Sequence, residues 1–129
     1  MRAAIPFAAR SIVEDDHRIR AILCHTRSGS TAQLIAAERP RTPVYAFGEN
    51  RSLIRRLAFT WGITPMPVEL TTGPDLLERM EAELVGRGQL TAGDVVAVVA
   101  TLGNAAHANM LVLHEVQTPG GASPHWEGA

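Results

Sequence analysis

Apolar residues recur along this chain at two spacings, and the two spacings predict two kinds of element. Where they return every three or four positions, the pattern is typical of a helix with one buried face. Where they form short uninterrupted runs, the pattern favours a buried strand. The helical spacing covers residues 5–16, 32–38, 51–61 and a segment that begins within 71–75 and ends at 86–88. The strand-like runs are residues 21–25, 43–47, 63–68, 95–100 and 109–116.

Two of the helical segments also predict which side chains face the core. The inner face of residues 51–61 is formed by Leu53, Ile54, Leu57, Ala58 and Trp61. Asn50 is expected to cap this helix at its N-terminus, and Gly62 at its C-terminus, where glycine accepts a left-handed conformation. In the fourth helix, Leu76, Leu77, Met80 and Leu84 are expected inside and Glu78, Arg79, Glu81 and Glu83 outside.

The order of these elements predicts the sheet. Strands that alternate with helices pair in parallel, because each helix carries the chain back across the sheet. Residues 95–100 are apolar throughout and should be buried on both faces, whereas two prolines in 63–68 favour an edge. Residues 101–108 are too few for a parallel crossover, so the last strand should be antiparallel. We therefore expect an α/β sandwich with a mostly parallel sheet of about five strands.

The composition limits the kinds of function that the chain can have. It has 129 residues, of which 46% are hydrophobic and 5% aromatic, and this fits one domain with an aliphatic core. A net charge of −1 gives no electrostatic basis for binding nucleic acid or a membrane surface. The single cysteine, Cys24, excludes an internal disulfide and a cysteine-based zinc site, and it suits a reducing compartment. We expect a cytoplasmic protein whose domain spans residues 1–116, followed by a flexible tail at 117–129.

The candidate chemistry lies in one turn between a predicted strand and a predicted helix. The turn comprises Thr26, Arg27, Ser28, Gly29, Ser30 and Thr31. A helix N-terminus offers free N–H groups and a positive dipole end, and hydroxyls and a guanidinium beside it favour a phosphate. The alternative is that Ser28 or Ser30 only caps the helix, while Gly29 permits the bend.

Residues near this turn give weaker signals. His25 ends one strand and His107 follows a neighbouring one, so both could form a polar rim with Thr101 and Asn104. No metal or cofactor is predicted, because no third ligand has a suitable spacing. Cys24 lies within an apolar run, and His25 would point to the opposite face of the sheet, so a buried thiol is favoured over a nucleophile.

Five short stretches occur together in an order and spacing that belong to one family. They are residues 26–32 (TRSGSTA), Arg39-Pro40 with 43–46 (PVYA), 55–58 (RRLA) with 61–65 (WGITP), 93–96 (GDVV) and Asn109-Met110. With them, the chain resembles the C-terminal domain of pyruvate kinase over about residues 3–116.

The resemblance implies a three-layer α/β/α sandwich with an antiparallel last strand. In the family this domain holds an allosteric site for sugar phosphates such as fructose 1,6-bisphosphate, and part of the tetramer interface. The family's phosphate-gripping loop corresponds by position to residues 26–31. Arg27 stands where the family often has a lysine.

Two departures from the family limit what the resemblance implies. The catalytic barrel of the kinase, with its lysine, Mg²⁺ ligands and K⁺ site, has no counterpart in this sequence, so the chain alone is not expected to be an enzyme. Residues 101–108 contain no Arg or Lys, although the corresponding loop is often basic or aromatic in members that respond to sugar bisphosphates. A monophosphate or an inorganic anion is therefore the expected ligand.

These observations leave three hypotheses. The first is a non-catalytic regulatory domain that binds a phosphate or sugar-phosphate effector at residues 26–31. The second is an assembly module that has lost its ligand and forms a homodimer through its apolar last strand. The third is a small enzyme of another kind, for which no acid–base pair or nucleophile–base spacing stands out. Under the first hypothesis the chain is either a stand-alone protein or a fragment of a full pyruvate kinase, the glycolytic enzyme that converts phosphoenolpyruvate and ADP to pyruvate and ATP.

Overall fold

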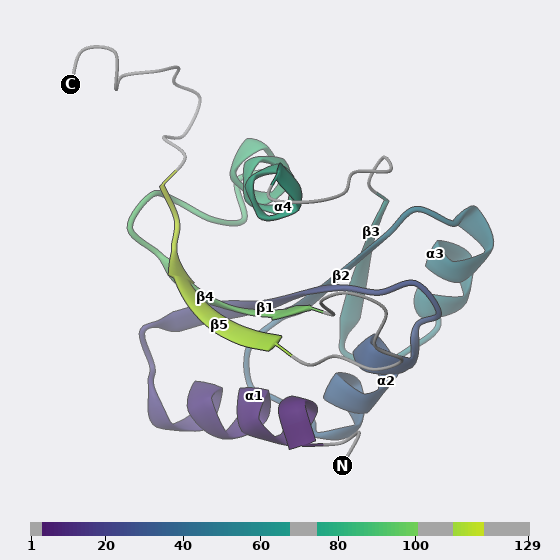
Figure 1. The fold of residues 1–129 in the computed structure, drawn as a ribbon, viewed down its shortest axis with the longest axis horizontal. Helices are drawn as coiled ribbons and strands as arrows, with labels where there is room; N and C mark the ends of the chain where they lie inside the picture. The colour runs from purple at the N-terminus through teal and green to yellow at the C-terminus, as the bar shows by residue number, and fades with distance from the viewer. Residues whose placement is uncertain (1–3, 68–74, 101–109, 118–129) are drawn as a thin grey trace.

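A computed structural model of the chain describes residues 4–67, 75–100 and 110–117 (Figure 1). Helices and strands follow one another in the order that the sequence predicts. The elements are α1 (Ala4–Asp15), β1 (Ile19–His25), α2 (Ser30–Ala37), β2 (Val44–Gly48), α3 (Arg51–Leu57), β3 (Ile63–Pro67), α4 (Asp75–Gly86), β4 (Val95–Ala100) and β5 (Met110–Glu115). None of the helices in these ranges is long and apolar enough to cross a membrane.

The strands form one mixed sheet in the order β3-β2-β1-β4-β5. All neighbouring strands are parallel except β4 and β5, which pair antiparallel with Val98 opposite Val112. Helices α1, α2 and α3 pack on one face of the sheet, and α4 packs on the other, where Figure 1 shows it alone above the strands. The predicted three-layer arrangement and antiparallel last strand are therefore confirmed.

The core is divided between the two faces of the sheet. Alternate residues of β1 point to opposite sides, so Ile22 and Cys24 join the cluster under α1, α2 and α3, while Leu23 joins the one under α4. In β4, residues 96–99 are all buried, as their continuous apolar run predicts. The strands β1 and β4 therefore form the centre of the domain.

The alternation in β1 is interrupted at one position. Ile19 pairs with Val95 and Ala21 with Val96, so β1 uses one more residue than β4 across this interval. The extra residue is Arg20, which makes the interval a β-bulge. Because of the bulge, Ile19 and Ala21 are buried on opposite faces although they are two positions apart.

The two edge strands differ in composition: β3 contains prolines, and β5 exposes apolar side chains. β3 carries Pro65 and Pro67, which lack backbone N–H groups, and its edge position confirms the interpretation of the prolines. β5 forms the other edge, and Val112 and Leu113 keep 38% and 46% of their surfaces exposed.

The C-terminus of α3 corrects the sequence analysis. The helix ends at Leu57, and its last carbonyls accept short-range bonds from Phe59 N and Thr60 N. These hydrogen bonds join residues three apart, so the chain turns more tightly than an α-helix and the helical face is not continued. As a result Ala58 is exposed, and Trp61 keeps 69% of its surface exposed. Trp61 instead packs beneath the guanidinium of Arg39, 5.1 Å from its ring centre. Gly62 does adopt a left-handed φ of 84°, but five positions beyond the helix.

The orientation of Glu81 was also predicted wrongly. Its side chain is buried, and its Oε1 atom lies 2.5 Å from Nε2 of His114 in β5. The other carboxylate oxygen accepts a hydrogen bond from the backbone N–H of Gln117 at 3.3 Å. The buried face of α4 is wider than the apolar spacing indicates, because the polar end of β5 passes beneath it. This contact attaches α4 to the last strand.

Removing the Glu81 carboxylate should destabilise the fold. In the Glu81→Ala variant, His114 and the N–H of Gln117 lose a part-buried partner, and we expect the free energy of unfolding to fall by about 2 kcal/mol. Glu78→Ala, on the exposed side of α4, is the control and should change it by less than about 0.5 kcal/mol. Urea denaturation of both variants measures the difference, and equal losses would contradict the role given to Glu81.

Replacing Thr42 with valine should stabilise the fold. The Thr42 hydroxyl oxygen is buried and has no hydrogen-bond partner among the described residues. Because valine has nearly the same shape without the polar atom, Thr42→Val should raise the free energy of unfolding by about 1 kcal/mol. Thr26→Val is the control, because the Thr26 hydroxyl accepts a bond from Gly29 N and its loss should destabilise. A destabilised Thr42→Val variant would mean that the hydroxyl has a partner in solution.

Candidate functional site

Residues 26–31 connect β1 to α2 at the carboxyl end of the parallel strands, as the sequence predicts. The backbone N–H of Thr26 donates to the carbonyl of Phe47 at 2.9 Å and attaches the turn to β2. The helix begins at Ser30, two residues earlier than the predicted start at residue 32. Ligands of open α/β sheets bind at this end of the strands, so the turn lies where a site is expected.

The bend of the turn depends on Gly29. Its φ of 92° lies in the left-handed region, and a Cβ atom there would lie 2.8 Å from Cδ1 of Leu53 in α3. Gly48 is similarly close, because an added Cβ would lie 3.1 Å from Cδ2 of Leu53 and 3.2 Å from the carbonyl oxygen of Thr26. The two glycines therefore allow Leu53 to pack directly against the turn and fix its backbone.

The start of α2 retains backbone donors that have no partner among the described residues. Gly29 N donates to the Thr26 hydroxyl at 2.8 Å, and Ser30 N makes a longer 3.4 Å contact with the Ser28 hydroxyl. Gly29 itself occupies the cap position, so the predicted cap by Ser28 is limited to that long contact. Within the described ranges, the N–H groups of Thr31 and Ala32 have no partner. Asn50, by contrast, caps α3 as predicted, with bonds from Ser52 N and Leu53 N.

The side chains of the turn divide into accessible and buried groups. Arg27 and Ser28 are exposed, and Ser30 is half-buried with a 3.3 Å bond to Ser28. Thr26 and Thr31 are buried, and the Thr26 hydroxyl supports the turn itself. The groups available to a ligand are thus the Arg27 guanidinium, the two serine hydroxyls and the free N–H groups of α2.

A carboxylate beside the turn was not anticipated. Glu49 follows β2, and its Oε1 atom lies 3.2 Å from Nε2 of His25 at the end of β1. The two strands are neighbours, so their carboxyl ends meet, and this register could have suggested the pair. His25 is therefore engaged with Glu49, and the carboxylate adds negative charge at the rim of the turn.

The sequence also suggested a polar rim around the turn, a buried thiol and the absence of a metal site. Thr101, Asn104 and His107 lie outside the described residues. Cys24 is fully buried, and desolvation raises the pKa of its thiol to about 12, so the thiol stays protonated and unreactive at neutral pH. Within the described ranges, no three His, Cys, Asp or Glu side chains are grouped as metal ligands would be. The accessible groups of the turn are thus hydroxyls, backbone N–H groups and one guanidinium.

Comparison with known proteins agrees with this architecture. The family model described as "Pyruvate kinase, alpha/beta domain" matches residues 3–114. The chain is 35% identical over 101 residues to a pyruvate kinase of Staphylococcus haemolyticus, covering 76% of this chain and 17% of that protein. It is 31% identical over 118 residues to a pyruvate kinase of Corynebacterium glutamicum, covering 88% of this chain and 24% of that protein.

A solved structure shows the same fold. A crystal structure of a pyruvate kinase from Cryptosporidium parvum superposes with a TM-score of 0.75 at 20% identity, covering 89% of this chain and 22% of the other. The chain thus spans less than a quarter of the pyruvate kinases to which it is similar. The matched residues include every described helix and all but the last residue of β5, and on this evidence the chain belongs to the family of pyruvate kinase alpha/beta domains.

Proposed function

We propose that this chain is a non-catalytic regulatory domain that binds a phosphate or sugar-phosphate effector at residues 26–31. One observation carries the proposal: the N–H groups of Thr31 and Ala32 have no partner in the described part of the chain, and the exposed Arg27 belongs to the same turn. Donors of this kind stabilise the charge of a phosphate, and the dipole of α2 adds to the attraction.

The number of available groups fits one phosphate. A bidentate bond from Arg27 and two or three N–H bonds would support millimolar to micromolar affinity, on the order of 4–8 kcal/mol. The carboxylate of Glu49 opposes a second negative group on the same side, although its contact with His25 reduces that effect. A monophosphate therefore suits the described half of the site better than a bisphosphate.

A regulatory role is favoured over phosphoryl transfer by how little of each relative this chain matches. The relatives named pyruvate kinase are far longer than the region they share with this chain, which covers 17% and 24% of their lengths. The proposed role thus needs only binding.

Replacing Arg27 should remove most of the affinity for phosphate. Arg27→Gln deletes the only guanidinium of the turn, and we expect the Kd for inorganic phosphate and for fructose 1,6-bisphosphate to rise at least about tenfold. Arg55→Gln makes the same charge change on the exposed side of α3 and is the control. Isothermal titration or thermal shift measures the affinity, and the proposal fails if both variants bind as the unchanged chain does.

A second candidate function, assembly, is favoured by the edge of the sheet. β5 has a strand neighbour on only one side, so its outer edge carries N–H and C=O groups that no strand among the described residues pairs with. Val112 and Leu113 point to opposite faces of this strand and are both substantially exposed. A second copy could pair with β5 and cover them, which would form a homodimer about a two-fold axis.

If β5 mediates assembly, a charge on it should dissociate the dimer. Leu113→Lys places an ammonium group on the exposed strand, where it would lie near its own copy across the two-fold axis. Light scattering at about 100 µM should report a dimer for the unchanged chain and a monomer for the variant. Phe59→Lys, at a position that is 91% exposed beyond α3, is the control and should remain dimeric. A monomeric unchanged chain at that concentration excludes this assembly.

A further inference from the structure

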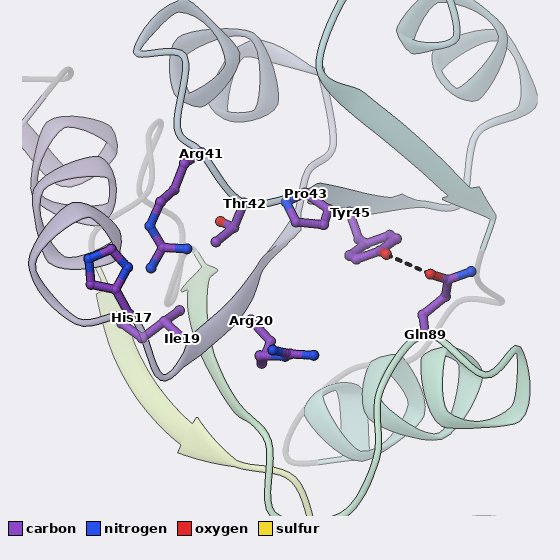
Figure 2. Close-up of a pocket in the computed structure, with 8 residues that line it drawn as sticks. All are labelled: His17, Ile19, Arg20, Arg41, Thr42, Pro43, Tyr45 and Gln89. Atoms are coloured by element: carbon purple, nitrogen blue, oxygen red, sulfur yellow. Dashed lines mark hydrogen bonds between the residues drawn. The ribbon is translucent and has the colours of Figure 1, made fainter.

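A pocket lies at the opposite end of the sheet from residues 26–31. It is a shallow, solvent-open hollow of about 330 Å³ where the first residues of β1 and β2 meet the segment that follows α4. Its wall includes His17, Arg20, Arg41, Thr42, Tyr45 and Gln89, and no Asp or Glu is among the described residues that line it. Figure 2 shows His17 and Arg41 at one end and Tyr45 and Gln89 at the other, with Arg20 between them. The volume is within the range of small-molecule sites.

The β-bulge in β1 gives this pocket its central cation. Arg20 is the extra residue of the bulge, so its side chain is displaced from the regular alternation that buries Ile19 and Ala21. It lines the pocket and makes no ion pair with any described residue. Bulges commonly redirect a side chain beside a functional site, and here the redirected group is a guanidinium.

The second guanidinium is held in place by the backbone. Nη2 of Arg41 donates to the carbonyl oxygens of Val13 at 2.7 Å and Asp16 at 3.1 Å, near the C-terminus of α1. Its Nε and Nη1 groups have no partner within the described ranges. The C-terminal carbonyls reduce part of its charge but fix its position, so it is oriented before any ligand arrives.

The carboxylate of Asp16, whose backbone carbonyl Arg41 contacts, is engaged elsewhere. Asp16 forms a 2.7 Å ion pair with Arg18, and hydrogen bonds from Arg18 lower the pKa of Asp16 to about 2. Asp16 therefore stays ionised and paired with a cation that does not line the pocket. The cationic side of the pocket keeps the charges of Arg20 and Arg41.

The other end of the pocket is polar and neutral. The Tyr45 hydroxyl donates to Oε1 of Gln89 at 3.1 Å, and burial raises the pKa of the phenol, which keeps its proton in place. The lone pairs of the Tyr45 oxygen and the amide N–H groups of Gln89 can then receive a neutral hydrogen-bonding group. Thr42, with its unpartnered hydroxyl, lies between the two ends.

We propose that this pocket binds a small organic anion, with a carboxylate or phosphate at Arg20 and Arg41 and a hydroxyl or amide at Tyr45 and Gln89. This site is separate from the turn at residues 26–31. Arg20 and Thr26 are near opposite ends of β1, and six extended residues span roughly 20 Å. The domain would thus carry one anion site at each end of its central strand.

Titration of the ¹⁵N-labelled chain followed by amide chemical shifts tests the proposal. The probes are inorganic phosphate, succinate and malate, which separate phosphate from carboxylate and a plain chain from one with a hydroxyl. We expect saturable shifts at residues 19–21 and 42–45 with at least one probe. Arg20→Gln should weaken that binding about tenfold or more, and Arg27→Gln should leave it unchanged. Tyr45→Phe should reduce any preference for malate over succinate.

The spectra also provide the control for folding and the outcomes that overturn the proposal. An Arg20→Gln spectrum with unchanged dispersion shows that lost binding is not lost structure. The proposal is wrong if no probe gives saturable shifts at these residues up to about 50 mM, a concentration that would detect millimolar affinity. It is equally wrong if Arg20→Gln binds as tightly as the unchanged chain, or if all saturable shifts are confined to residues 26–31.

Discussion

The burial of β1 on all sides is the constraint on which the rest of this domain depends. The strand lies between β2 and β4 in the sheet and between two layers of helices, so residues 21–24 are each at most 1% exposed to solvent. A polar side chain there would lose its hydration without a partner, so the interior of the strand is apolar and its thiol is unreactive. Polar chemistry is therefore confined to the two ends of β1, where Arg20 begins it and His25 ends it.

The two ends of the strand achieve their geometry by different means. At the carboxyl end, Gly29 and Gly48 let Leu53 pack against the backbone of the turn that leads into α2. At the amino end, a bulge redirects Arg20 while the carbonyls of α1 hold Arg41. Both arrangements hold polar groups in fixed positions, and such groups would cost less entropy if a ligand bound to them.

The chain matches one domain of the pyruvate kinases and not the whole enzyme. The family match covers residues 3–114, whereas the chain covers only 17–24% of the curated pyruvate kinases compared with it. Within that shared region, the described residues offer donors for an anion and no grouped metal ligands. The exposed strand β5 and the pocket at the amino end are two further surfaces of the domain, and both are open to test.

The sequence by itself determined the element order, the antiparallel last strand, the edge position of β3 and the place of the candidate turn. These features follow from local rules: apolar spacing, the missing N–H of Pro65 and Pro67, a connection too short for a crossover, and hydroxyls beside a helix start. The cap at Asn50 is local in the same sense. Each depends on residues that are close together in the chain.

Only the tertiary structure decided the features in which distant segments meet. Glu81 is buried because His114 and the N–H of Gln117 reach it from β5, and Trp61 is exposed because tight turns end α3 early. The pocket is lined by residues from the segment after α1, from β1, from β2 and the residues before it, and from the segment after α4. Arg20 lines it at a β-bulge, and the alternation of apolar and polar residues along the sequence does not predict that bulge. The physical reason is that register, packing and charge pairing depend on three-dimensional neighbours, which hydrophobic spacing along one strand or helix does not specify.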